Sequence, residues 1–157
     1  MRLSIWFSFI LLLSMVAGCQ KQPDFTATDG QAIYLKSAAD RWTILNIWAQ
    51  WCGPCRKEIP EFNALAKHKD LNVLGYDFDG DTGDRLKHKV RMMGIQFPVI
   101  EGNPLTVLEL PLPQVLPTTL MINPQGKVMD ILYGPQTEEG MIHRVNKLKK
   151  QGVSNGH

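Results

Sequence analysis

Apolar and polar positions along the chain alternate in blocks that predict strands separated by helices. Residues 43–49 read Thr-Ile-Leu-Asn-Ile-Trp-Ala, an almost continuous apolar run typical of a strand that is buried on both faces of a sheet. A second run at residues 71–78 predicts a second strand. We expect the first of these strands to lie at the centre of the sheet, because it offers almost no polar face to solvent.

Helical spacing follows each of these two runs. In residues 54–67, apolar side chains recur at i, i+3, i+6 and i+7 from Ile59, which places them on one face of a helix. A second helix is predicted for residues 84–93, ended by Gly94. Helices that connect strands in this way make the neighbouring strands parallel.

The C-terminal third has the pattern of an antiparallel hairpin followed by a helix. Apolar runs at residues 118–122 and 127–132 flank the turn sequence Asn123-Pro124-Gln125-Gly126. A last helix is predicted to start at Thr137, whose hydroxyl caps it, and to reach about residue 150.

Two parts of the chain carry weaker patterns. Residues 31–35 predict an early strand. The stretch at residues 94–117 is rich in proline and leucine, and we expect a short helix there at residues 105–110.

The N-terminus has the order of a secretory signal. Arg2 precedes an apolar block at residues 3–13, and small residues follow at Val16-Ala17-Gly18. The block is shorter than the roughly 20 residues of a membrane-spanning helix, which favours a cleaved signal. An uncleaved anchor is the alternative. Val16-Ala17-Gly18-Cys19 resembles the lipobox of bacterial lipoproteins, and the resemblance implies cleavage before Cys19 and lipidation of that cysteine.

The chain is therefore divided into a signal peptide (residues 1–18), a tether (19–24), one domain (25–150) and a flexible C-terminal tail (151–157). A length of 157 residues suits one ordinary domain with its own core. Lys and Arg number 17 against 15 Asp and Glu, a net charge of +2 that gives no basis for nucleic-acid binding.

Candidate chemistry lies in Cys52-Gly53-Pro54-Cys55, directly after the predicted central strand. Two thiols at this spacing, between a strand and a helix, are typical of a dithiol/disulfide redox site. At a helix N-terminus, unpaired backbone N–H groups and the helix dipole favour the thiolate of Cys52. Gly53 permits the tight turn, and Pro54 suits the first helical position because its missing N–H costs nothing there.

Other interpretations of the cysteine pair were weighed. A structural zinc site needs four ligands, and the chain has no second C-x-x-C and no closely spaced histidine pair. A purely structural disulfide would close too short a loop to stabilise the fold much. The cluster of Asp77, Asp79 and Asp81 lacks the glutamate that closes a calcium loop, so we interpret it as a turn. We therefore expect no metal and no organic cofactor.

Several motifs together resemble the thioredoxin superfamily, and within it the extracytoplasmic TlpA/ResA type, over about residues 24–150. They are Trp48-Ala49-Gln50-Trp51, Cys52-Gly53-Pro54-Cys55, Gly94-Ile95-Gln96-Phe97-Pro98-Val99 and Leu116-Pro117-Thr118-Thr119. The resemblance implies an α/β thioredoxin fold in a single domain, with a central mixed β-sheet flanked by helices. It also implies that Cys52 and Cys55 form a redox-active disulfide.

The same resemblance implies how substrates bind. Pro117 matches a family proline whose peptide bond is cis and which packs beside the cysteines. Leu116 would then offer backbone hydrogen bonds to an extended substrate peptide. Trp51, Gly53 and Pro54 flank the thiols, where Trp51 would add apolar contact to partners.

Asn46 stands where cytoplasmic thioredoxin carries a buried aspartate, and an amide cannot take a proton from Cys55. Extracytoplasmic relatives share this asparagine and place a glutamate where this chain has Glu58, which implies a role for Glu58 in proton transfer. The alternative is a first-turn carboxylate that the helix dipole favours.

The expected function is that of a lipid-anchored thiol–disulfide oxidoreductase that reduces disulfides of exported proteins. The resemblance implies a DsbD-type or CcdA-type membrane protein as electron donor. Gln20, in place of the aspartate of inner-membrane lipoproteins, predicts an anchor in the outer membrane facing the periplasm if the source is Gram-negative. A disulfide oxidase or isomerase, or a non-catalytic client-binding module, are the alternatives.

Overall fold

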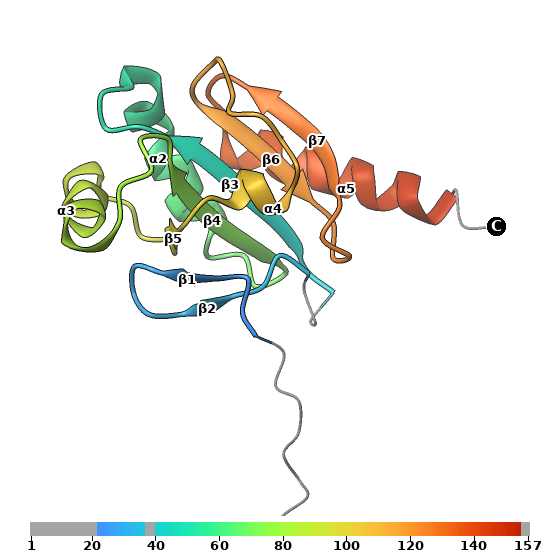
Figure 1. Ribbon diagram of the computed structural model, residues 1–157. Coiled ribbons are helices and arrows are strands. Elements are labelled where there is room, and N and C mark those ends of the chain that lie inside the picture. The colour runs from blue at the N-terminus through green and yellow to red at the C-terminus, as the bar shows by residue number, and fades with distance from the viewer. Residues whose placement is uncertain (1–21, 37–39, 155–157) are drawn as a thin grey trace, which may run out of the picture.

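The computed structural model describes residues 22–36 and 40–154 (Figure 1). The predicted signal peptide, Cys19 and the first part of the tether lie outside the described residues. The helices of the described chain are α2 (Gly53–Leu65), α3 (Gly83–Met93), α4 (Pro104–Val107) and α5 (Glu138–Ser154). Its strands are β1 (Phe25–Ala27), β2 (Ala32–Ile33), β3 (Trp42–Trp48), β4 (Leu71–Asp77), β5 (Ile100–Glu101), β6 (Thr118–Ile122) and β7 (Val128–Tyr133).

Four strands form the main sheet in the order β4-β3-β6-β7, so the prediction that β3 is central is confirmed. β3 runs parallel to β4, to which α2 connects it, and antiparallel to β6. β6 and β7 form the predicted hairpin. The register places Asn46 of β3 between Gly75 of β4 and Thr119 of β6.

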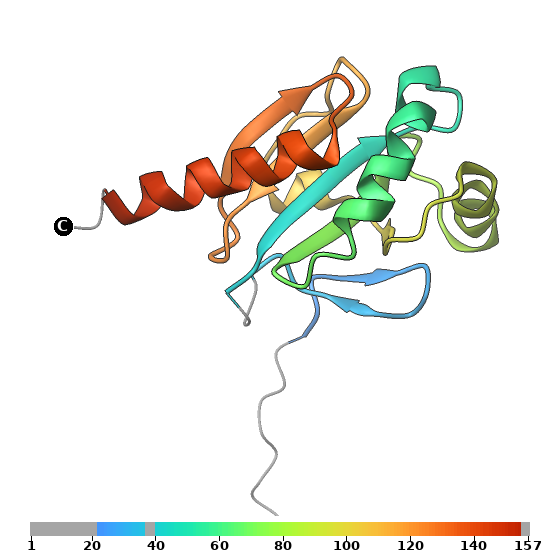
Figure 2. The ribbon, with the colours of Figure 1, turned by 180° about the vertical axis from the view of Figure 1, so that it is seen from behind.

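β3 is buried along its whole length because both faces of the sheet are covered. Ile44 and Trp48 belong to an apolar cluster that includes side chains of α2 and α5, and Figure 2 shows these two helices lying across that face. Leu45 and Ile47 belong to a second cluster, to which β1, β2 and α4 contribute. The alternation along β3 is the two-residue period of a strand with apolar contacts on both sides.

A small antiparallel sheet in the order β2-β1-β5 lies beside the main one and was only partly predicted. The predicted strand at residues 31–35 is shortened to β2, and β1 and β5 were missed. Strands of two or three residues are too short for a periodic pattern. β1 pairs with the nearby β2 and also with β5, which is distant in sequence.

The helix ends follow local chemistry. Gly94 ends α3 in the left-handed conformation, with φ of 68°, as predicted. The Thr137 hydroxyl accepts a hydrogen bond from the Gly140 N–H at 3.2 Å, which confirms the predicted cap of α5. α4 is shorter than predicted and begins at Pro104, one residue early.

The last helix extends further than predicted, since α5 continues through residues 151–154 of the predicted tail. Adding a residue to an existing helix gains a backbone hydrogen bond without a new nucleation cost, and no proline follows to stop it. Residues 155–157 lie outside the described residues. Within the described ranges, no helix is both long enough and apolar enough to cross a membrane.

Candidate active site

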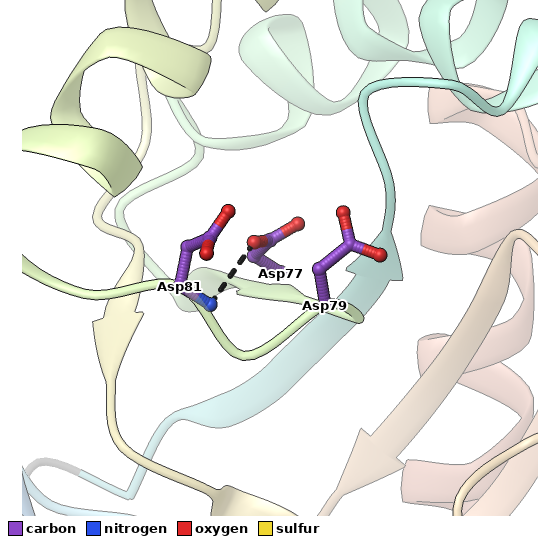
Figure 3. Close-up of side chains that lie close together, drawn as sticks. All are labelled: Asp77, Asp79 and Asp81. Carbon is purple, nitrogen blue, oxygen red and sulfur yellow. Dashed lines mark hydrogen bonds between the residues drawn. The ribbon is translucent and has the colours of Figure 1, made fainter.

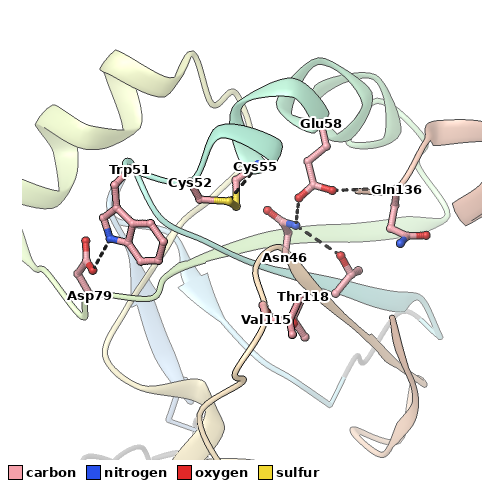
Figure 4. The surroundings of a disulfide bond; sticks show 10 residues. Asn46, Trp51, Cys52, Cys55, Glu58, Asp79, Val115, Thr118 and Gln136 are labelled. Atoms are coloured by element: carbon pink, nitrogen blue, oxygen red, sulfur yellow. Dashed lines mark hydrogen bonds between the residues drawn. A yellow bond between two sulfur atoms is a disulfide. The ribbon is translucent and has the colours of Figure 1, made fainter. Parts of the chain in front are cut away.

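Cys52 and Cys55 form a disulfide where β3 leads into α2, with their Cα atoms 5.3 Å apart (Figure 4). Gly53 and Pro54 occupy the first positions of α2, as predicted. The two cysteines differ in access, since the Cys52 residue is 5% exposed and Cys55 is fully buried. An incoming sulfur can therefore approach Cys52 first.

Cys52 is the N-cap of α2, and its environment favours negative charge on its sulfur. Its backbone is extended, with φ of −80° and ψ of 107°, and its sulfur accepts a hydrogen bond from the Cys55 N–H at 3.1 Å. This N–H is one of the donors that a helix N-terminus leaves without a backbone partner. The helix dipole acts in the same direction, so a thiolate on Cys52 is stabilised in the reduced protein.

An open groove runs past Cys52, and we call it the thiol groove. Its lining residues are Trp51, Cys52, Gly53, Pro54, Phe78, Pro113, Gln114 and Leu116. The structure thus brings together four of the five residues that the sequence suggested for substrate contact, namely Trp51, Gly53, Pro54 and Leu116. The fifth, Pro117, does not line the groove. Phe78, Pro113 and Gln114 were missed, because they reach the groove through tertiary contacts that no local pattern signals.

The Leu116–Pro117 peptide bond is cis, as the family resemblance implied. Pro117 is buried, and its carbonyl accepts a hydrogen bond from the Gly134 N–H at 2.9 Å. Leu116, by contrast, is half-buried and lines the groove.

Trp51 stands at the edge of the thiol groove and is 62% exposed. Its indole N–H donates to Asp79 Oδ1 at 3.1 Å. Its ring also packs edge-to-face on Phe78, with ring centroids 6.1 Å apart. These two contacts hold a large apolar surface in solvent beside Cys52, which suits contact with a partner.

Glu58 is a buried carboxyl on α2, one turn beyond Cys55. Its Oε1 accepts a hydrogen bond from the Asn46 amide at 2.7 Å, and its Oε2 accepts one from the Gln136 N–H at 3.0 Å. Burial raises the pKa of Glu58 from 4.5 to about 7, although both hydrogen bonds act to lower it. A carboxyl with this pKa can exchange a proton near neutral pH.

The Asn46 side chain lies between the Glu58 carboxyl and the disulfide in Figure 4. The Asn46 nitrogen is the donor to Glu58, so the amide oxygen faces another way. Its oxygen is buried, has no hydrogen-bond partner among the described residues, and points to the disulfide side in Figure 4. The Asn46 oxygen is therefore a buried acceptor without a donor among the described residues.

The three aspartates that the sequence suggested as a turn come together at the end of β4 (Figure 3). The turn is confirmed by the hydrogen bond from the Gly80 N–H to the Asp77 carbonyl at 2.9 Å. Lys89 of α3 places its Nζ 2.9 Å from Asp77, 2.6 Å from Asp79 and 2.6 Å from Asp81. The lysine ammonium supplies the positive charge that these carboxylates need.

We call Lys89, Asp77, Asp79 and Asp81 the lysine cluster. Contacts among these side chains, together with burial, shift their pKa values. Burial raises the pKa of Asp77, against the opposing hydrogen bond from Lys89. Burial also acts upward on Asp79, but hydrogen bonds from Lys89 and Trp51 outweigh it and lower that pKa. Burial acts downward on Lys89, yet its bonds to the aspartates raise its pKa above the usual value. The cluster connects to the active site through the hydrogen bond from Trp51 to Asp79.

Comparison with known proteins agrees with this geometry. Residues 19–131 match the AhpC/TSA family. The chain is 33% identical over 132 residues to the thiol-disulfide oxidoreductase ResA of Bacillus subtilis, covering 82% of this chain and 73% of that protein.

Two solved structures extend the comparison. The exposed lipoprotein thioredoxin Etrx1 of Streptococcus pneumoniae strain TIGR4 gives a TM-score of 0.64 at 22% identity, covering 78% of this chain and 96% of that one. A putative thiol:disulfide interchange protein DsbE from Chlorobium tepidum gives 0.58 at 26% identity, covering 83% and 94%.

These matches confirm the resemblance and the thioredoxin fold that the motifs implied. The chain therefore belongs to the AhpC/TSA family of the thioredoxin superfamily, as a thiol–disulfide oxidoreductase of the ResA type.

Proposed function

We propose that this protein is a lipid-anchored reductase of disulfide bonds in exported proteins. The observation that carries the proposal is the placement of the two sulfurs: Cys52 lines an open groove, and Cys55 is buried behind it on the same helix. In the reduced protein, the Cys52 thiolate attacks one sulfur of the client disulfide and expels the other as a thiolate. Cys55 then attacks Cys52, releases the second client sulfur, and forms the Cys52–Cys55 disulfide. Two electrons pass from the protein dithiol to the client.

The second step needs a base for the Cys55 proton, and we assign this role to Glu58. Its pKa of about 7 allows the carboxylate to take a proton at neutral pH. The unpartnered Asn46 oxygen is suited to accept a hydrogen bond from the reduced Cys55 thiol and to hold that sulfur in the same pocket. Glu58→Gln should slow the resolution of the mixed disulfide and leave the first attack nearly unchanged. The alternative of a first-turn carboxylate is wrong, because Glu58 is the sixth residue of α2 and lies beyond its first turn. Equal rates for resolution in both proteins would remove Glu58 from the mechanism.

The client is expected to lie extended along Leu116, pairing with its backbone, while Trp51 and Pro54 contact the residues around the client cysteine. The Leu116 N–H donates no hydrogen bond to another described residue, and the side chain borders the groove. Leu116 can therefore add main-chain bonds to a bound peptide without losing any of its own.

The place of action follows from Cys19. The lipobox-like sequence supports lipidation at Cys19, with the domain held in the periplasm by its lipid and, in a Gram-negative cell, at the outer membrane. One structural neighbour is itself an exposed lipoprotein. A DsbD-type or CcdA-type membrane protein would return the electrons. Cys19→Ala should abolish incorporation of labelled fatty acid, and a wild-type protein that carries no lipid would contradict the anchor.

A trapping experiment tests the function in the cell. In Cys55→Ser, the mixed disulfide between Cys52 and its client cannot be resolved and should accumulate. Thiols are quenched with acid, and complexes are isolated and identified by mass spectrometry. Cys52→Ser/Cys55→Ser is the matched control and should hold no client. If exported proteins with cysteine pairs are not enriched over this control, the proposed function is wrong.

A further inference from the structure

A second depression lies beside the thiol groove and is lined mainly by apolar side chains. It is a cavity of about 390 Å³ that opens to solvent. Its floor includes Ile47, Leu105 and Leu120, and its rim includes Leu112, Val115 and Tyr133. The floor belongs to the sheet face that carries α4, opposite the face covered by α2 and α5. We call this cavity the apolar pocket.

The rim of the apolar pocket exposes unusually large side chains. Leu112 is 49% exposed, Val115 50% and Tyr133 62%. Single exposed apolar residues are normal on a protein surface, but several that surround one apolar cavity mark a binding site. The described residues provide no segment that covers this rim.

The apolar pocket adjoins the thiol groove. Pro113 and Gln114 line both, so residues 111–115 form the wall between them. A polypeptide that lies extended along Leu116, as proposed above, runs beside this wall when its disulfide reaches Cys52. Its neighbouring side chains then lie next to the opening of the apolar pocket.

The wall is also shaped to pair with a peptide. The N–H groups of Leu112, Gln114 and Val115 donate no hydrogen bond to any other described residue. The Val115 carbonyl accepts a hydrogen bond from the Thr118 hydroxyl at 2.6 Å, which fixes the wall to β6. An anchored segment with free donors is a suitable edge for an added strand.

We propose that the apolar pocket is a subsite for one large apolar side chain of the client polypeptide. The inference rests on the proposed reduction of client disulfides, because the client cysteine at Cys52 sets the register. Residues 112–116 span about 13 Å if extended at roughly 3.3 Å per residue. A client strand paired with this wall therefore places its apolar side chain within about four residues of its cysteine.

Synthetic peptides test this subsite directly. Each peptide has nine residues with one central cysteine, is otherwise built of serine and alanine, and is used as its symmetric disulfide. One phenylalanine is moved through the four positions on each side of the cysteine. The reduced enzyme is mixed with each peptide, and the second-order rate constant for disulfide reduction is measured. We expect at least one position to raise the rate constant about tenfold or more over the peptide without phenylalanine, given the gain from burying such a side chain.

The rim variants Leu112→Glu and Val115→Glu place a charge at the mouth of the apolar pocket and should reduce the phenylalanine preference to about one. Met92→Glu is the matched control, because Met92 is 65% exposed on α3 and does not line either depression; it should keep the full preference. The preference is a ratio within one variant, so a general change in stability or thiol reactivity cancels.

The outcomes separate the subsite from the function. If wild-type protein reduces the serine peptide but no position favours phenylalanine, or if both rim variants keep the preference, the subsite is wrong and the proposed function stands. If the serine peptide is not reduced faster than by Cys52→Ser/Cys55→Ser, the proposed function fails. A wild-type dimer in sedimentation that the rim variants dissociate would show that a second copy of the chain covers the pocket, and would overturn the proposal.

Discussion

Replacing Glu58 by glutamine should remove a pH-dependent loss of stability from the oxidised protein. Glu58 is 2% exposed, and burial raises its pKa from 4.5 to about 7 in the folded state. In the unfolded chain the carboxyl is in water and has its ordinary pKa near 4.3. Over the range between these two values, the folded protein retains a proton that the unfolded chain has already released.

Linkage gives the sign and size of the effect. Because the folded state binds more protons than the unfolded state between about pH 4.5 and pH 7, the free energy of unfolding falls as pH rises through this range. One pKa unit corresponds to about 1.36 kcal/mol, so this group costs the wild-type protein about 3 kcal/mol between about pH 4 and pH 8. Glutamine carries no such proton. The Glu58→Gln protein loses part of the hydrogen bonding with Asn46 or Gln136. This loss lowers its free energy of unfolding by about 1 kcal/mol at every pH.

Urea unfolding of oxidised wild-type and Glu58→Gln proteins, at five values from about pH 4 to pH 8, measures this difference. The variant should gain about 3 kcal/mol relative to wild type across the range, since the other titrating groups are common to both proteins and cancel. Glu61→Gln makes the same chemical change on the same helix at a half-buried position and is the matched control. Parallel curves for wild type and Glu58→Gln would refute the reasoning.

Three further predictions follow from the packing. Limited alkylation of the reduced protein should modify Cys52 before Cys55, because only the former lines the thiol groove, and peptide mass spectrometry would show the reverse order if the roles were exchanged. Lys89→Met removes the ion pairs of Asp77 and Asp79, while Asp81 keeps its pair with Arg85, and should cost on the order of 3 kcal/mol in urea unfolding; a loss below about 1 kcal/mol would mean that solvent replaces the lysine. Gly75→Ala should cost about 1–3 kcal/mol, since the added Cβ would lie 3.0 Å from Phe97 and two other side chains, and an unchanged midpoint of thermal unfolding would contradict this overpacking.

The sequence predicted those parts of the fold whose pattern is local. The seven-residue β3 has a continuous apolar run, and α3 has Gly94 at its end, so both were placed within a residue or two. The cysteine pair was found because its spacing and its position after a strand are visible in one short segment. β1 and β5 were missed because two or three residues carry no periodic pattern, and their pairing with each other joins segments that are distant in the chain.

The candidate site shows the same division. Glu58 was singled out by the family resemblance, but its pKa depends on burial and on Gln136, 78 residues away. The bond from Trp51 to Asp79 and the ion pairs with Lys89 arise from three separate elements that only the fold brings together. Pro113 and Gln114 reach the thiol groove in the same way.

The reduction potential of the Cys52–Cys55 pair tests the central claim most directly. The protein is equilibrated with glutathione buffers of graded potential, quenched with acid, alkylated and analysed by mass, so that the fraction of dithiol is read at each potential. A reductase should titrate as one two-electron couple, nearer to about −270 mV than to about −120 mV. A midpoint near about −120 mV would instead assign the protein to the oxidation of its clients, and the absence of a two-electron transition would contradict a catalytic dithiol altogether.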